Sequence, residues 1–575
     1  MQPITPLRSN KRLFQPFGSL INRIEQKPAS DRLVLRVLFF AIIGTFIWGI
    51  LSVNNAYLAS TPVPGGTLVE GIVGIPRFVN PVLAVTRADL DMTALIYRGL
   101  MKIDTEGKLV PDLAESVTVS DDGKTYNIIM RRDVRFHDDT PLTARDVAYT
   151  IGLIQNPDLK SPIRGNWSGV TIEEISEYEL NIVLDEAYTP FIENFTVGIV
   201  PRHIWSELPI EQVPFSQRNT EPIGSGHFKI AKVVRNEAGL IERYELERAH
   251  SGVKLEQMIV RFYQNETTLA TDFKAGLIMS TANLPLEELG TAEQKANFTL
   301  VEEPLPRVFG VFFNQNKSLI LRDAAVREAL DIMVDRDSIV RDALLGYGVP
   351  TISPIPPSTT EVHSSSTDSA NRLERATATL TKAGWQKNQN NAWEKRIDGS
   401  TVVLAITIRT ANTALFERTT TAVAQAWRTL GVQVEVEQYE QSDLLQAVIR
   451  PRDFEALLFG IDMNRTVDLY PFWHSSQRED PGLNIAQYAN IEVDSLLASA
   501  RINTNESERQ NASVSAMNII MNERPATFLY VPTLTYMIAD EVTVAPMNKI
   551  SRPQERFMNI DTWHVAREDR WPMFR

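Results

Sequence analysis

The chain has 575 residues, of which 43% are hydrophobic and 22% are charged, with no cysteine and a formal net charge of −13. This is the composition of an ordinary globular protein, with enough chain for about three to four domain-sized units. The lack of cysteine excludes a disulfide framework, a thiol nucleophile, a thiolate metal site and a lipid anchor on cysteine. The negative charge argues against nucleic acid as a partner.

An uncharged apolar run covers residues 37–53, VLFFAIIGTFIWGILSV. Together with residues 33–35 it approaches the roughly 20 residues with which a helix crosses a membrane. Seven basic and two acidic residues precede it, and this excess predicts a cytoplasmic N-terminus. We therefore predict a cytoplasmic tail over 1–32, a single-pass anchor over 33–53, a linker over 54–64 and an extracytoplasmic remainder at the cell membrane.

A cleaved secretory signal is the alternative interpretation of the same run. Such a signal has a short basic region, an apolar core of about 7–15 residues and small residues before the cleavage point. Here the leader is longer, and Tyr57 stands where a small residue is wanted before Ala59. These features favour a retained anchor.

The next residues show a succession of strand and helix patterns. A buried strand is predicted over 65–74, followed by a loop and then by a helix that begins near Asp91 and runs into a strand. Asp122-Gly123 predicts the turn of a hairpin between two alternating stretches. Thr143 and Asp146 form a capping box that starts a further helix.

Residues 97–151 carry a dense and ordered pattern of motifs. They read Y-x-G-L, G-x-L-V-P-D-L-A-E-S, S-D-D-G-K-T-Y and R-x-x-V-x-F-H-D-x-T-P-L-T-A-x-D-V. This pattern resembles the signature of the family 5 solute-binding proteins, the dipeptide and oligopeptide receptors of ABC importers. One departure is Asp139, because the family usually has glycine at that turn position.

The resemblance continues along the chain. PIGSGHFKI at 222–230 resembles a second family motif, with His227 in place of the usual proline, and FKAGLIM at 273–279 resembles a third. The stretch that begins at Val311 resembles the strand, helices and proline-rich loop of the family's third domain. Independently, Asp323 is predicted to cap one helix and Asp335 or Asp337 a second, and the later alternation of helices and strands predicts an α/β lobe.

The resemblance implies an α/β, two-lobed periplasmic-binding-protein-like fold with a hinge, preceded by the transmembrane helix. We expect lobe I over 65–300 with an inserted small domain at about 112–220, lobe II over 301–530, and a C-terminal segment over 531–575 that returns to lobe I. The implied function is the extracytoplasmic substrate-binding component of an ABC transporter, which captures peptides in a hinged cleft. Its implied partners are an oligopeptide or dipeptide ligand and the ABC permease and ATPase subunits, and we expect a monomer without a cofactor.

Residues 460–477 resemble the stretch where many family members place an aspartate against the α-ammonium of the ligand. A buried ammonium needs such a partner, because an uncompensated charge in a closed cleft costs several kcal/mol. Asp468 matches the second acidic position of the family motif, Thr466 stands at the first, and Asp462 is the nearest substitute. The structural alternative for either aspartate is a helix cap or a solvated loop charge.

Other candidate ligand contacts come from this stretch and from the edges of the lobes. Trp473 and His474 either line a side-chain pocket or pack in the core. Glu70 follows a strand that points toward the expected cleft. The next loop holds Asn80, Thr86 and Arg87, and the strand and turn that enter lobe II hold Phe313 and Asn314. The full set of candidates is Asp468, Asp462, Asn464, Trp473, Asn314, Phe313, Glu70, Asn80, Thr86 and Arg87.

An enzyme is the main rival class, and the sequence does not favour it. We find no G-x-S-x-G, H-E-x-x-H or phosphate-binding glycine-lysine motif. Ser251 to Lys254 satisfies S-x-x-K without an accompanying K-T-G. A second rival keeps the fold but binds a nickel chelate, haem or an oligosaccharide. A third is a role outside transport, as a peptide sensor or a chaperone. Fold alone does not decide among these, although seven dispersed histidines disfavour a metal.

Overall fold

The computed structural model describes residues 28–57, 59–62, 65–293, 297–356, 369–463, 465–503, 505–565 and 567–570. The chain divides into two compact units. One consists of Met1–Val63 with Ala566–Arg575, and the other of Pro64–Val565.

The first unit contains the apolar helix α2 (Ala29–Tyr57) and a short two-stranded sheet. Within α2, the segment Leu33–Ile50 has a mean hydropathy of 2.3 and is not buried. It is long and apolar enough to cross a membrane, a test that a signal sequence near the N-terminus also passes. Strand β1 (Ala59–Pro62) pairs antiparallel with β23 (Arg567–Arg570). Residues 1–27 of the predicted cytoplasmic tail lie outside the described residues.

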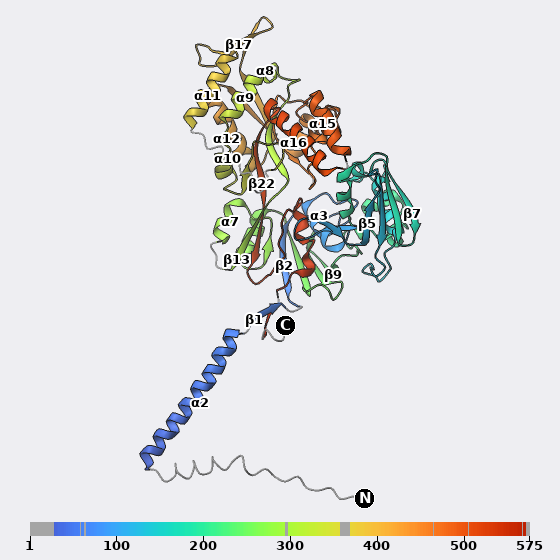
Figure 1. Ribbon diagram of the computed structural model, residues 1–575, viewed down its shortest axis with the longest axis vertical. Helices are drawn as coiled ribbons and strands as arrows, with labels where there is room; N and C mark the ends of the chain where they lie inside the picture. Colours follow the sequence, from blue (N-terminus) through green and yellow to red (C-terminus); the bar gives the residue numbers. More distant parts are fainter. Residues whose placement is uncertain are drawn as a thin grey trace. The chain divides into compact units, whose positions relative to one another are not determined.

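The second unit is built on a sheet in which 12 strands are described, with the path β20-β19-β21-β14-β22-β12-β2-β11-β10-β9. Strands β13 and β15 pair with β22 beside this path. We call the part around β2 lobe I and the part around β14 lobe II (Figure 1). The strands of lobe I are β2 (Thr67–Val73), β9 (Phe228–Arg235), β10 (Ile241–Arg248), β11 (Gln257–Tyr263), β12 (Ser280–Thr281) and β13 (Phe298–Pro304). Those of lobe II are β14 (Arg307–Phe313), β15 (Gly348–Pro350), β19 (Ala405–Ala411), β20 (Gln433–Tyr439) and β21 (Ala456–Asp462).

Strand β22 (Ala526–Ala539) belongs to both lobes, and Figure 1 shows it running between α12 and β13. Its first residues pair with β14, and from Thr533 onward it pairs with β13. At the change of partner, the backbone N–H of Leu305 donates to the carbonyl of Pro532. The β13–β14 connection and the middle of β22 therefore form a strand crossing that joins the lobes.

Smaller sheets and helices complete each lobe. Lobe I carries the pair β3 (Met101–Ile103) and β4 (Leu109–Pro111) and a four-stranded antiparallel sheet of β5 (Ala114–Val119), β6 (Thr125–Met130), β8 (Glu179–Leu184) and β7 (Val170–Ser176). Its helices are α3 (Arg87–Ile96), α4 (Ala144–Gln155), α5 (Arg202–Trp205), α6 (Glu266–Lys274) and α7 (Leu286–Glu293), with short 3₁₀ segments η1 (Arg164–Trp167), η2 (Thr189–Thr196), η3 (Ile210–Phe215), η4 (Gln217–Asn219), η7 (Pro553–Phe557) and η8 (Ile560–Thr562). The domain boundaries predicted from the sequence stay a prediction.

Lobe II has its helices on both sides of its strands. They are α8 (Leu319–Arg322), α9 (Ala324–Met333), α10 (Arg336–Ala343), α11 (Ser369–Lys382), α12 (Ala414–Leu430), α13 (Gln441–Asp443), the π-helical turn η5 (Leu444–Ile449), α14 (Tyr470–Trp473), the 3₁₀ turn η6 (Ser475–Gln477), α15 (Ile491–Ile502) and α16 (Glu506–Glu523). A small sheet of β16 (Gln386–Lys387), β17 (Trp393–Ile397) and β18 (Ser400–Val403) lies beside them. Alternate residues of β14 enter two different cores: Val311 and Phe313 one, Val308 and Phe312 the other. A strand buried on both faces reads as a continuous apolar run, as this one does.

Several local predictions are confirmed. The hairpin between β5 and β6 forms, with Val119 opposite Tyr126. The Asp323 side chain caps α9, and Asp335, rather than Asp337, caps α10. Helix α12 ends where Gly431 adopts a φ of 100°, a left-handed conformation that glycine takes without strain.

The predicted start of α3, the helix that follows β2 in the chain, was wrong. Thr86 and Arg87 were placed in a loop and the helix near Asp91, whereas α3 begins at Arg87. The reason is a capping box in which Thr86 caps the helix and the carboxylate of Asp89 accepts a hydrogen bond from the Thr86 backbone N–H. The T-x-x-D pattern is the one that identified Thr143 and Asp146, so the signal was present.

The two family motifs around residues 137 and 225 lie against each other. The backbone N–H of Gly224 donates to Nδ1 of His137, and Nε2 of the same ring lies 3.1 Å from the carbonyl of Gly226. Burial lowers the pKa of His137 to about 4, so the ring is neutral. In the same turn Asp139 has a φ of 67°, which explains why the family usually has glycine there.

Candidate functional site

Asp468 lies in lobe II and contacts both lobes. Its Oδ1 accepts a hydrogen bond from the backbone N–H of Tyr470, 3.0 Å away. Its Oδ2 accepts one from the Tyr188 hydroxyl of lobe I at 3.2 Å and lies 3.3 Å from Nε of Arg501. The side chain of Asp468 is 11% exposed. The carboxylate thus accepts the first backbone N–H of a short helix, pairs with a cation and joins the lobes.

Arg465, just before Asp468, reaches across to lobe I. Its guanidinium lies 2.5 Å from a carboxylate oxygen of Glu555 and donates to the carbonyls of Gly107 and Lys549. The backbone N–H groups of Arg465 and Thr466 donate to the carboxylate of Glu193. We call these contacts and those of Asp468 with Tyr188 and Arg501 the lobe contact.

The ionisation of the lobe contact follows from its partial burial. Burial raises the pKa of Glu555, and Arg465 opposes this rise. Burial, and then the charge of Asp468, raise the pKa of Tyr188 to about 12. Tyr188 therefore stays protonated at physiological pH and remains a hydrogen-bond donor to Asp468.

The other predicted residues of this stretch do not join the lobe contact. Asp462 ends β21 with its side chain 55% exposed, and it pairs with Arg307 at 2.9 Å. Asn464 lies outside the described residues. Trp473 is fully buried and packs against Phe312 and Phe528. His474 stacks on Tyr470 at the surface.

The candidates at the entrance to lobe II lie in its interior. Phe313 is fully buried and contacts Trp427. Asn314 is buried as well, and its side-chain amide donates to the carbonyl of Arg452. These contacts hold the turn after β14.

The candidates in the segment after β2 also have structural partners. The Asn80 side chain is buried, donates to Asn219 and accepts from the backbone of Val82. Thr86 caps α3. Arg87 donates from Nε to Asp91, while its terminal Nη2 is buried without a hydrogen-bond partner among the described residues.

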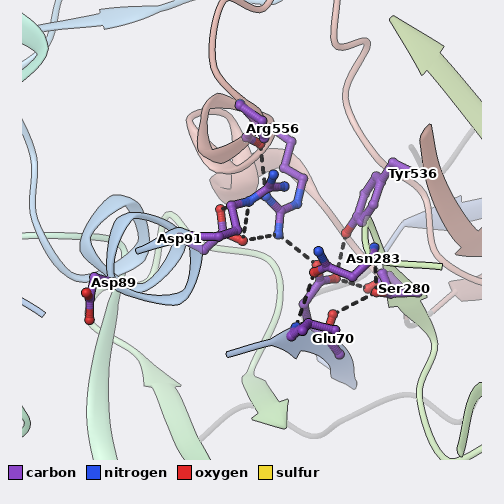
Figure 2. A network of polar contacts seen from close by, with 12 residues as sticks. Glu70, Asp89, Asp91, Ser280, Asn283, Tyr536 and Arg556 are labelled. Atoms are coloured by element: carbon purple, nitrogen blue, oxygen red, sulfur yellow. Dashed lines mark hydrogen bonds and ion pairs between the residues drawn. The ribbon is translucent and has the colours of Figure 1, made fainter. Parts of the chain in front are cut away.

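Glu70 belongs to a group of charges in the interior of lobe I (Figure 2). Its carboxylate lies 3.0 Å from Arg556 and accepts hydrogen bonds from Tyr536 and Ser280. Arg556 also pairs with Asp91 at 2.8 Å. The side chains of Glu70, Asp91 and Arg556 are 0% exposed. We call Glu70, Asp91, Tyr536 and Arg556 the buried cluster.

Opposite charges keep Asp91 and Arg556 of the buried cluster ionised. Burial would raise the pKa of Asp91, but Arg556 and Arg87 outweigh it and lower the pKa. Burial would lower the pKa of Arg556, but Asp91 and Glu70 raise it. The cluster joins β2, α3, β22 and η7, and Glu70 faces these partners rather than a cleft.

A cavity of about 150 Å³ lies in lobe I beside the lobe contact, since Glu193 and Glu555 line it. Trp167 and Met101 provide apolar lining, and the hydroxyl of the buried Tyr97 has no hydrogen-bond partner among the described residues. Charged side chains, among them Arg98, Lys102 and Asp112, also line the cavity, so its wall is partly apolar and partly polar.

The sequence interpretation missed most members of the lobe contact. Tyr188, Glu193, Arg465, Arg501 and Glu555 were not candidates. None of these five matches a quoted family motif, and their positions span more than 350 residues. Among the described residues, no group of three or more histidine or acidic side chains is placed to hold a metal ion.

Comparisons with known proteins agree with this architecture. The model of "Bacterial extracellular solute-binding proteins, family 5 Middle" matches residues 108–481. The chain is 26% identical over 518 residues to the oligopeptide-binding protein AppA of Bacillus subtilis, covering 88% of this chain and 93% of that protein. It is 27% identical over 317 residues to the nickel-binding periplasmic protein of Escherichia coli, covering 53% and 59%.

A solved structure is similar over nearly the same range. The oligopeptide-binding protein AppA from Bacillus subtilis, in complex with a nonapeptide, matches with a TM-score of 0.68 and 25% identity. The match covers 88% of this chain and 100% of that one.

Proposed function

Because the chain belongs to the family 5 bacterial extracellular solute-binding proteins, we propose that it is the peptide-binding component of an ABC importer. It captures peptides between its lobes and delivers them intact to a membrane permease that works with an ATPase. The similarity to a nonapeptide-bound protein over most of both chains supports a peptide as the ligand. The protein binds its ligand without catalysis.

The lobe contact is the observation that carries this proposal. The lobes are joined by the strand crossing at residues 304–307 and 531–533, and they meet again through the polar side chains of the lobe contact. The Arg465 and Glu555 side chains are only 15% and 9% exposed, but their contact can separate without breaking any strand pairing, whereas the strand crossing is continuous backbone. The arrangement suits hinge motion, with a peptide held between the lobes when they close.

Peptide capture in such a cleft needs few specific side chains. An extended peptide presents the same backbone donors and acceptors whatever its sequence. Each neutral hydrogen bond contributes roughly 0.5–1.5 kcal/mol, and each bond to a charged group about 1.5–3 kcal/mol. A few of them reach about −8 kcal/mol, which corresponds to micromolar affinity. The cavity beside Glu193 suits one side chain of the ligand.

We also propose that α2 is retained as a single-pass anchor, with the bulk of the chain outside the cell. The mean hydropathy of 2.3 over Leu33–Ile50 supports this, as does the charge asymmetry around the run. Tethering raises the local concentration of the receptor at its permease. Replacing residues 37–53 by a cleavable signal should release a soluble monomer; persistent membrane association would contradict the single anchor.

The peptide function is tested by identifying what the purified full chain carries. Native mass spectrometry before and after denaturation should detect bound peptides. Adding a pool of random peptides to the emptied protein should raise its midpoint of thermal unfolding, because a ligand that binds the folded state stabilises it. A rise with a nickel–histidine chelate, haem or an oligosaccharide, and none with peptides, would replace the proposed ligand. Cleavage of the peptides would instead show an enzyme.

A further inference from the structure

Asp468, the aspartate that the family resemblance assigns to the ammonium of a ligand, already has a cation from its own chain. Arg501 on α15 lies 3.3 Å from its Oδ2, which also accepts the Tyr188 hydroxyl. The other carboxylate oxygen accepts the N–H of Tyr470. Both oxygens of Asp468 are therefore engaged.

Aromatic rings hold this cation in place. The guanidinium carbon of Arg501 lies 4.5 Å from the ring centroid of Tyr188 and 4.5 Å from that of Tyr470. A guanidinium between two tyrosine rings gains cation–π attraction on both of its faces. Arginine also stays charged at every pH at which proteins fold. Arg501 is thus a permanent positive charge beside Asp468, an ion pair in which its Nε makes no aligned hydrogen bond.

The neighbouring polar groups are occupied as well. Thr466 stands where the family motif has its first acidic residue, and its backbone N–H donates to Glu193. The second nearby carboxylate, Asp462, pairs with Arg307. Among the described residues of the 462–468 segment, both carboxylates have an arginine partner.

An incoming ammonium would face a cost at this place. It would have to displace the guanidinium of Arg501 from Asp468 or accept its repulsion at short range. A neutral amide at the same position meets no such repulsion. We propose that Arg501 takes the place of the ligand ammonium, so that the protein binds peptides without recognising a free N-terminus.

The ligand class that follows is an N-acylated peptide, or an interior stretch of a longer peptide whose charged end lies outside the cleft. This inference rests on the proposed peptide function. Arg501 acts as a specificity-determining residue through its pairing with Asp468. Removing it should expose the carboxylate and create a preference for a free amine.

The test uses the full chain in detergent and two pools of random nonapeptides, one with free N-termini and one N-acetylated, with affinity measured by calorimetry. For the wild type we expect affinities for the two pools that agree within about threefold. In Arg501→Gln we expect the free-amine pool to bind about tenfold tighter than the acetylated pool, a difference of about 1.4 kcal/mol. The double variant Arg501→Gln/Asp468→Asn should lose this preference, and Arg341→Gln, which removes an exposed arginine of the same lobe, should behave as wild type.

A wild type that binds the free-amine pool tenfold tighter than the acetylated pool would overturn the inference and leave the peptide function standing. So would an unchanged ratio in Arg501→Gln. If neither pool binds the wild type or Arg501→Gln, the peptide function itself fails and the inference fails with it. The wild-type comparison decides the matter even if Arg501→Gln does not fold.

Discussion

The buried cluster and the lobe contact both hold an arginine between a carboxylate and aromatic rings. In the buried cluster, Arg556 pairs with Asp91 and its guanidinium carbon lies 3.9 Å from the ring centroid of Phe557. In the lobe contact, Arg501 pairs with Asp468 between two tyrosines. The side chain of Arg556 is 0% exposed and that of Arg501 is 32% exposed.

The two groups also differ in the lobes that their residues come from. All members of the buried cluster belong to lobe I, and no hinge movement would separate them. The lobe contact joins residues from two lobes, so opening the hinge separates Tyr188 from Asp468 and Arg465 from Glu555. Similar groups of side chains thus lie within one lobe in the first case and join two lobes in the second.

The largest effect is expected from removing Arg556. Arg556→Gln leaves Glu70 and Asp91 buried without their counter-charge, and we expect the free energy of unfolding to fall by about 3–5 kcal/mol. Denaturant unfolding of the full chain, followed by tryptophan fluorescence, measures this. Arg341→Gln removes a surface pair with Asp342 and should cost at most about 1 kcal/mol. Equal losses for the two variants would show that the buried cluster is not a structural unit.

Removing Arg465 should affect the lobes rather than the fold. Arg465→Gln loses charged contacts with Glu555 and with two backbone carbonyls, so the open form should gain about 2–3 kcal/mol relative to the closed form. Small-angle scattering of the ligand-free protein should show a larger radius of gyration. The control is Arg307→Gln, which removes an exposed pair with Asp462. A profile identical to that of the wild type would contradict the role of the lobe contact in closure.

Acid should destabilise the fold through His137 rather than through the buried cluster, in which the arginines hold the pKa of Asp91 below its usual value. Burial lowers the pKa of His137 to about 4 in the folded protein, from its ordinary value of 6.5. The His137 ring therefore binds a proton more readily in the unfolded chain than in the folded one. The stability that this ring contributes is complete above about pH 6.5 and is lost as the pH falls toward 4. Between pH 7 and pH 5 the loss should be about 1–2 kcal/mol. His137→Gln should remove this part of the pH dependence in unfolding titrations; a slope equal to that of the wild type would exclude His137 as its source.

The smallest effects are expected for the two aspartates of the 462–468 segment. Asp468→Asn leaves Arg501 without its carboxylate and loosens the lobe contact, so peptide affinity should fall about three- to tenfold, or about 0.7–1.4 kcal/mol, the range for one neutral hydrogen bond. Asp462→Asn affects an exposed pair and should change affinity less than about twofold. Calorimetry with the same peptide pool compares the two. Equal, unchanged affinities would remove both residues from the site.

Local patterns in the chain predicted much of the fold. Apolar alternation identified β2 and the β5–β6 hairpin, and the capping pattern at Asp323 identified the start of α9. These features depend on residues a few positions apart, which is why they can be read directly. The missed start of α3 was of the same local kind, because the Thr86–Asp89 capping box was present in the sequence.

The candidate site was less predictable, because its geometry depends on distant partners. Glu70 and Asp468 are similar in the sequence, because both are acidic residues that stand near or after a predicted strand. Glu70 meets Arg556, which is 486 positions away, in the interior of lobe I. Asp468 meets Tyr188, which is 280 positions away, between the lobes.

The sequence by itself determined the family, the α/β architecture with its long apolar helix, and the segment that contains Asp468. Periodicity, capping residues and ordered motifs carry this information, because they reflect short-range constraints on the backbone. Only the tertiary structure decided which carboxylates are buried with an arginine and which stand where the two lobes meet. Burial and charge pairing decide whether an ionised group stabilises the fold or remains available to a ligand, and both depend on contacts between residues hundreds of positions apart.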